Sequence, residues 1–229
     1  DVLQNPYESA RRALRYEALA AAEVNPLVKL DWMRQHAIEL LNAGESLRAA
    51  ARFAEIEREE ARLGNSRPED LRTTQILKAM SWLRHGEQEN CITNHTIESC
   101  LLPIQGRGVH QLRRGSTEAR SILTQILEKD PERLDARWLL NIAAMTLGEY
   151  PHGVPERWRV PPARFESDHD IGRFTDVADD LGLAGNAVSG GVIIDDFNND
   201  GFLDLLVSAF GLTDQVRFFV NAGDGTFTE

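Results

Sequence analysis

The feature that most constrains the fold is a run of ten residues, 195–204, which reads Asp-Asp-Phe-Asn-Asn-Asp-Gly-Phe-Leu-Asp. Counted from Asp196, positions 1, 3, 5 and 9 carry side-chain oxygens and position 6 is glycine; these residues are Asp196, Asn198, Asp200, Asp204 and Gly201. Calcium takes six to eight oxygen ligands, and a glycine permits the sharp bend that wraps a chain around one ion. The run therefore predicts a calcium loop, with the backbone carbonyl of Phe202 at position 7 as a further ligand.

Apolar runs on both sides of this loop predict strands rather than helices. Residues 188–194 precede it and residues 203–210 follow it, and both runs are rich in β-branched or bulky apolar side chains over strand-like lengths. A third run, 216–220, leads into a Gly- and Asp-rich turn at 221–227. A helical calcium loop would close with Glu at position 12, whereas this one closes with Asp at position 9. We expect a meander of about three strands, and not an EF-hand.

The arrangement resembles the FG-GAP (VCBS-type) repeat of β-propellers, as in integrin α-subunits and the cartilage acidic protein-like bacterial family. The resemblance covers roughly residues 165–229 and rests on three motifs in order: the lead-in Phe174-Thr-Asp-Val-Ala178 followed by Leu181-Gly-Leu183, the loop Asp196-x-Asn198-x-Asp200-Gly201-x-x-Asp204, and the turn Asn221-x-Gly-Asp-Gly-x-Phe227. It departs from the family at Asn198, where Asp is common. The resemblance implies a partial first propeller blade at 174–229, a structural calcium ion, and interaction or scaffolding outside the cytoplasm, in the periplasm or as a secreted protein.

The acidic excess of the chain is confined to this C-terminal part. Residues 165–229 hold 13 acidic and 2 basic side chains, whereas residues 1–164 hold 23 of each, and the whole chain has a net charge of −11. Such a field attracts cations and disfavours nucleic acid, whose binding needs clustered Lys and Arg. No apolar stretch is long enough for a membrane span. The first residue is Asp1 rather than Met, which is expected of an exported protein whose leader was removed, or of a cloned fragment.

The N-terminal part, 1–150, predicts an α-helical domain. Asn25-Pro26 begins a helix that ends at Gly44, a third helix continues to about Leu63, and a fourth runs from Pro68 to Gly86. Two segments resemble tetratricopeptide repeats: one carries Gly44, Ala49 and Phe53, and the other carries Ala119, Leu123, Ile126, Asp130-Pro131, Trp138, Leu140, Gly148, Glu149 and Tyr150. An irregular helical bundle is the alternative. The fold class is therefore α+β multidomain: tetratricopeptide-like helices, then the first blade of a calcium-binding propeller.

A cysteine-containing insertion at 87–114 interrupts the helical pattern. Cys91 and Cys100 are the only cysteines, and the eight residues between them form a closable loop, so a disulfide in an oxidising compartment is the leading interpretation. A more specific alternative is a zinc or copper site formed by Cys91, His95, Cys100 and His110, although the spacing of these four residues fits no common zinc pattern. Two unpaired thiols are the third possibility. A c-type haem is not indicated, since no Cys-x-x-Cys-His occurs.

Residues 151–173 predict a connector, because four prolines, Pro151, Pro155, Pro161 and Pro162, prevent a continuous helix. Trp158 and Phe165 are candidate anchors that would dock it on the helical surface.

No catalytic motif appears: there is no nucleophile elbow, phosphate-binding glycine loop or His-Glu metalloprotease helix. We expect no enzyme, but an interaction protein that binds protein partners through its helical repeats and its propeller, as part of a longer chain or a subunit of a larger complex. A longer chain or a larger complex is expected because a propeller needs four to eight blades of four strands each, whereas this chain supplies only a partial first blade. The alternative function is a metal- or redox-active protein centred on Cys91, His95, Cys100 and His110.

Overall fold

The structure, a computed structural model of the chain, describes residues 3, 5, 7–64, 68–94, 96, 98–99, 101–169, 172, 174–185, 189–211 and 214–229. The chain divides into two compact units, Asp1–Ser167 and Asp168–Glu229. The first unit is helical and the second contains the strands, which confirms a mixed α+β organisation.

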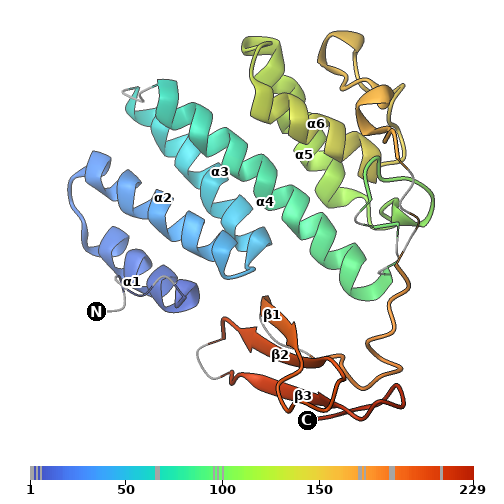
Figure 1. Cartoon of the computed structure of the whole chain (residues 1–229). Coiled ribbons are helices and arrows are strands. Elements are labelled where there is room, and N and C mark those ends of the chain that lie inside the picture. The colour runs from blue at the N-terminus through green and yellow to red at the C-terminus, as the bar shows by residue number, and fades with distance from the viewer. Residues whose placement is uncertain are drawn as a thin grey trace. The chain divides into compact units, whose positions relative to one another are not determined.

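The helical unit consists of helices that follow one another in space as they do in the chain (Figure 1). They are α1 (Ser9–Ala22), α2 (Pro26–Asn42), α3 (Ser46–Leu63), α4 (Pro68–Asn94), α5 (Arg114–Lys129) and α6 (Leu134–Thr146), with short 3-10 turns at Gly106–Gly108, Glu156–Trp158 and Pro162–Phe165. Each α-helix packs against the next one along the chain. The Asn25 side chain accepts a hydrogen bond from the Leu27 N–H at 3.0 Å and so caps α2, and Gly64 ends α3 at a φ of 63°. Within the described residues, no helix has the length and apolar character needed to cross a bilayer.

The predicted end of the fourth helix at Gly86 is wrong, because α4 continues to Asn94. Gly86 lies instead where α4 and α5 come closest. A Cβ atom added to Gly115 of α5 would stand 2.6 Å from the Gly86 nitrogen and 2.6 Å from the Trp82 carbonyl oxygen. Gly86 and Gly115 therefore allow two helix backbones to approach, a use of glycine that looks the same in sequence as a helix end.

Replacing Gly115 with alanine is expected to destabilise the helical unit by about 1–3 kcal/mol, because a Cβ atom would collide with the α4 backbone. Helix propensity alone predicts the opposite sign, a gain of about 1 kcal/mol. The measurement is urea unfolding of the intact chain followed by circular dichroism at 222 nm. Thr117→Ala on the exposed side of α5 is the control; equal stability of the two variants would contradict the close approach.

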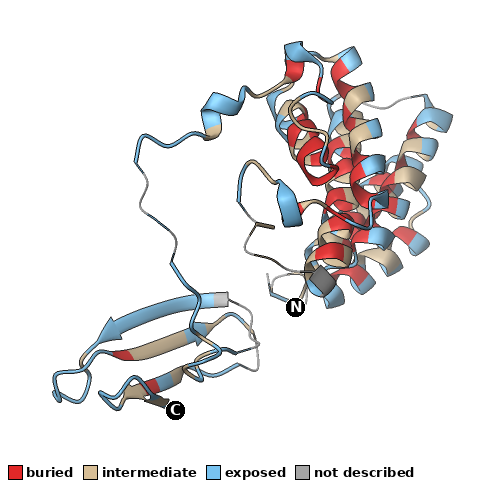
Figure 2. Ribbon diagram, turned by 90° about the vertical axis from the view of Figure 1, so that its right-hand side faces the viewer, coloured by how far each residue is buried: buried red, intermediate tan, exposed pale blue. Residues whose placement is uncertain are grey.

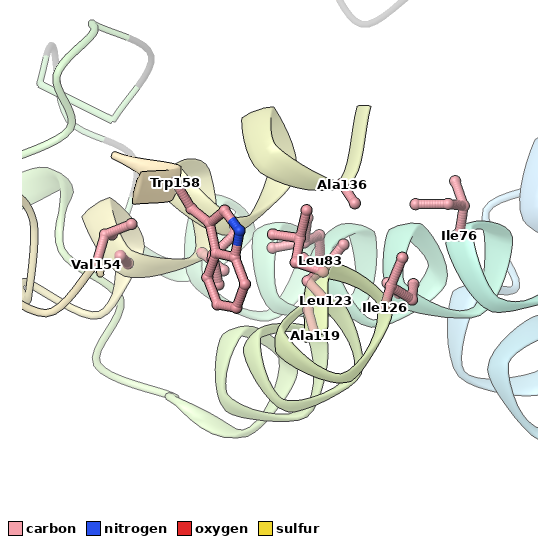
Figure 3. Close-up of a cluster of buried hydrophobic side chains, with 13 residues drawn as sticks. Ile76, Leu83, Ala119, Leu123, Ile126, Ala136, Val154 and Trp158 are labelled. Carbon is pink, nitrogen blue, oxygen red and sulfur yellow. The ribbon is translucent and has the colours of Figure 1, made fainter. Parts of the chain in front are cut away.

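The helical unit contains two clusters of buried side chains. One joins α1, α2 and α3 around Leu40, Phe53 and Ile56. The other joins α4, α5 and α6 and also includes Val154 and Trp158 from the proline-rich segment (Figure 3). Residues 151–167 are thus part of the helical unit, and the second cluster is incomplete without them.

Hydrogen bonds fasten the proline-rich segment to α6. The Trp158 carbonyl accepts bonds from Arg137 Nε at 3.1 Å and from Asn141 Nδ2 at 2.9 Å, and the Val160 N–H donates to Asn141 Oδ1 at 3.0 Å. Tyr150 Oη donates to the Val160 carbonyl at 2.7 Å. Much of this segment has no regular secondary structure, so its backbone N–H and C=O groups take side chains as hydrogen-bond partners.

The second unit is an antiparallel sheet in the order β1-β2-β3-β4. The strands are β1 (Ser189–Asp195), β2 (Asp204–Ala209), β3 (Arg217–Asn221) and β4 (Phe227–Thr228). Ile194 pairs with Leu205, which in turn pairs with Phe219. The three expected strands are confirmed, and the turn at 221–227 adds a short fourth strand.

The sheet has little core of its own (Figure 2). In the described part of this unit, Asp204 and Phe219 are the buried residues. Val192, Ile193 and Ile194 of β1 are each 57% exposed. Because neighbouring residues of a strand point to opposite faces, β1 presents bulky apolar side chains on both faces of the sheet.

Candidate functional site

The predicted calcium loop is the connection between β1 and β2. Its two ends are held together because Asp195, the last residue of β1, pairs with Asp204, the first residue of β2. Two residues with positive φ turn the chain between them: Asn199 at 59° and Gly201 at 91°. Asparagine and glycine tolerate this left-handed region better than other residues, so the local sequence suits the turn.

Inside the turn, the side chains predicted as ligands are directed back to the loop backbone. Asp196 accepts hydrogen bonds from the N–H groups of Asp200 at 3.1 Å and Gly201 at 2.9 Å. Asn198 Oδ1 accepts from the Asp200 N–H at 2.9 Å, and Asn198 Nδ2 donates to Asp200 Oδ2 at 2.8 Å. Asp200 Oδ1 accepts from the Phe202 N–H at 2.8 Å. The structure therefore brings Asp196, Asn198 and Asp200 together within one turn.

Asp204 differs from the other carboxylates because it is fully buried, with 0% exposure. Its Oδ2 accepts a hydrogen bond from the Phe197 N–H at 3.2 Å, and its Oδ1 accepts one from the Asn221 N–H at 2.8 Å. One carboxylate thus ties the predicted calcium loop to the end of β3. Sequence reasoning placed Asp204 among the ligands but missed this second role.

The loop and the turn at 221–227, two of the motifs noted in the sequence, are neighbours in space. Asn221 Nδ2 donates to the Leu203 carbonyl at 3.1 Å, and Asn221 Oδ1 accepts from the Gly223 N–H at 2.9 Å. A Cβ atom at Gly223 would lie 2.5 Å from the Phe202 ring, so glycine is required at that position for the ring to lie where it does. The two motifs form one folded corner of the sheet.

The donor set suits a hard cation. A carboxylate oxygen that accepts one N–H retains a lone pair for a metal ion, and calcium prefers carboxylate, amide and carbonyl oxygens. Among the residues that the structure describes, no group of three or more His, Cys, Asp or Glu side chains is gathered as around an ion. The ligand set Asp196, Asn198, Asp200, Phe202 and Asp204 therefore stays a prediction.

The cysteine-containing segment is only partly described. His95 and Cys100 lie outside the described residues, so neither the Cys91–Cys100 disulfide nor the four-residue metal site is tested. Cys91, in the last turns of α4, and His110 line a common cavity.

His110 belongs to a buried polar network. Its Nδ1 lies 3.1 Å from Ser116 Oγ, which accepts a hydrogen bond from Thr146 Oγ1 at 2.8 Å. The His110 N–H donates to the Thr146 carbonyl at 2.8 Å. Burial lowers the pKa of His110 from its ordinary value, so the imidazole is neutral at pH 7.

No family model, curated protein or solved structure matches this chain.

Sequence reasoning missed the cavity that Cys91 and His110 share. It is a hollow of about 710 Å³ formed by α4, α6, Ser99 and the segment 101–110. Most of its wall is apolar, including Met80, Leu83, Ile92, Leu102, Ile104, Trp138, Leu139 and Ile142. The apolar residues of 101–104 in the sequence were a signal, but three separate segments form the wall and no local pattern joins them.

Proposed function

We propose that this chain is a non-catalytic interaction protein, in which a tetratricopeptide-like helical unit is joined to a blade of a calcium-stabilised β-propeller. The observation that carries the proposal is the run Val192-Ile193-Ile194, which leads directly to the acidic loop and is more than half exposed on both faces of its sheet. An antiparallel sheet with one solvated face would alternate apolar and polar residues. Apolar side chains on both faces require a cover on each side.

A propeller supplies such covers, because blades of four antiparallel strands stand face to face around a common axis. The order β1-β2-β3-β4 is that of a single blade. Ile193, Leu206 and Phe218 form a row on one face, and Ile194, Leu205 and Phe219 form a row on the other. We infer that sheets of the same kind cover both rows.

In this proposal calcium has a structural role. Asp196 and Asp200 lie in one turn, where their like charges repel each other, and a divalent cation would neutralise them. Asp196, Asn198, Asp200 and Asp204 would hold the ion through side chains, and Phe202 through its carbonyl. An exposed loop of this kind suits weak sites that fill at the millimolar calcium of extracytoplasmic compartments. That supports a periplasmic or secreted location.

The helical unit would present the protein-binding surface. Each helix packs on its neighbour in the chain, and α4 also contacts α2 and α6, as in stacked helical repeats. Ala49 and Phe53, at the small and aromatic positions of the repeat pattern, are fully buried. A hollow of about 500 Å³ between α3, α4 and α5 is lined by alanines, by polar and charged side chains and by large apolar side chains such as Trp82 and Ile122, and it could take an extended segment of a partner.

Calcium is expected to raise the melting temperature of the β unit by about 5–10 °C at tenfold excess over its dissociation constant. All four Trp and all three Tyr precede residue 168, so tryptophan fluorescence reports the helical unit alone and scanning calorimetry reports both units. The intact chain is compared in calcium, in magnesium and in a chelator. The calcium-dependent transition should be the one that fluorescence does not detect.

Asp200→Asn should abolish the calcium shift, since it removes one charge from the loop at nearly constant shape. Asp180→Asn is the matched control, because Asp180 is exposed and outside the loop. An unchanged calorimetric trace of the unaltered chain on chelation, or a shift that persists in Asp200→Asn, would overturn the proposal.

A further inference from the structure

The cavity formed by α4, α6, Ser99 and the segment 101–110 has the size of a small-molecule site. Its volume is about 710 Å³, within the range of 300–1,000 Å³ that is usual for ligand pockets. Its rim leaves large apolar side chains in water: Ile92 is 82% exposed, Leu102 41% and Trp138 42%. An occupant would remove this surface from water, which favours binding of an apolar molecule.

The charged groups at the cavity favour a neutral occupant. Arg84 and Glu87 of α4 contribute to the wall, but Arg84 Nη1 lies 2.9 Å from Glu87 Oε2, so the two charges compensate each other. Lys side chains do not appear in the wall, and the remaining polar groups there are uncharged or belong to the neutral His110. A charged ligand would find no unpaired counter-charge among the described residues that line the cavity.

His110 supplies one directed polar group in this apolar wall. Only 7% of the residue is exposed. Ser116 Oγ accepts a hydrogen bond from Thr146 Oγ1, and in one tautomer of the His110 ring Ser116 donates its own proton to Nδ1. In that tautomer the single proton of the neutral ring lies on Nε2, which is then a donor for an oxygen acceptor in the cavity.

We propose that His110 adopts this Nε2–H tautomer and that the cavity binds a neutral, apolar small molecule with a carbonyl oxygen, which accepts a hydrogen bond from His110 Nε2. This site is independent of the calcium loop and goes beyond the proposed interaction function. It needs neither His95 nor Cys100.

The test uses the full chain in a chelator, with Nile red, a neutral apolar dye that carries a carbonyl, as the probe. We expect saturable binding at one site per chain, seen as a rise in dye fluorescence. Leu102→Asp should weaken it at least tenfold by placing a charge at the rim. Val24→Asp, at a residue that is 94% exposed and outside the cavity, should leave it unchanged.

The role of His110 is tested by competition. 2-Acetylnaphthalene and 2-isopropylnaphthalene have similar shapes, but only the first carries a carbonyl. His110→Phe keeps a ring and loses the donor, so the ketone should lose roughly three- to tenfold in competition relative to the hydrocarbon. Circular dichroism checks that the variant folds; where it does not, the Leu102→Asp and Val24→Asp pair decides.

Three results would overturn the inference: no saturable Nile red binding, binding that Leu102→Asp leaves intact, or an unchanged ketone-to-hydrocarbon ratio in folded His110→Phe. Binding unaffected by Leu102→Asp would locate the dye on another apolar surface, such as the faces of the sheet. Because the experiment contains no calcium, its failure is separate from failure of the calcium proposal.

Discussion

Trp158→Ala is expected to lower the free energy of unfolding of the helical unit by about 3–5 kcal/mol, the usual cost of removing a large aromatic side chain from a core. Trp158 is 2% exposed and lies in the cluster built by α4, α5 and α6, with Val154 beside it (Figure 3). The truncation would leave a cavity, and it would loosen the segment whose carbonyl at residue 158 bonds Arg137 and Asn141. The cost therefore includes both the lost packing of the side chain and the weakened hydrogen bonds of the backbone at residue 158.

Urea unfolding of the intact chain, followed at 222 nm, measures this loss, since the α-helices of the described chain all belong to the first unit. Trp138→Ala is the comparison: it removes the same side chain from a position that is 42% exposed and packs on Phe165, so a smaller loss of about 1–2 kcal/mol is expected there. Similar losses for the two variants would show that residues 151–167 do not complete the helical core.

Asp204→Ala is expected to destabilise the β unit by about 2–4 kcal/mol even in a chelator. The carboxylate is fully buried and accepts the N–H groups of Phe197 and Asn221. Removing it leaves two partly buried donors without an acceptor, at up to about 1–3 kcal/mol each. This effect is separate from calcium, because the hydrogen bonds exist between protein groups alone.

Hydrogen exchange with mass spectrometry localises the change, and peptides covering Phe197 and Asn221 should lose protection first. Asp195→Ala is the control, because Asp195 pairs with Asp204 in the strand register but is exposed; a change within about 0.5 kcal/mol is expected. If Asp204→Ala matters only when calcium is present, Asp204 is a ligand and not a structural acceptor.

Trp158 and Asp204 both depend on contacts between residues distant in the chain, whereas other features of the fold depend on local sequence. The strands, the turn between them and the helices α2, α3, α5 and α6 follow from patterns within a few residues: apolar periodicity, the Asn25 cap, and glycines such as Gly64 and Gly201 at positive φ. These features depend on backbone preferences and nearest neighbours, and a sequence displays both. The acidic loop was found for the same reason, since all its side-chain oxygens lie within nine residues.

Four features needed the tertiary structure. Gly86 looked like a helix end, but its role depends on Gly115, which is far along the chain. Asp204 looked like one ligand among several, but its burial depends on β3 and the Asn221 N–H. Trp158 enters a core whose other members, apart from Val154, come from three helices, and His110 lies in a cavity wall formed by separate segments.

The sequence by itself therefore determined the element types, the two-part organisation and the candidate calcium loop, because these arise from local spacing and composition. The tertiary structure alone decided which glycines separate helices, which carboxylate holds the sheet corner, where the proline-rich segment docks, and which side chains share a cavity. These outcomes depend on close packing between residues distant in the chain, where a difference of a few tenths of an ångström decides which side chain fits.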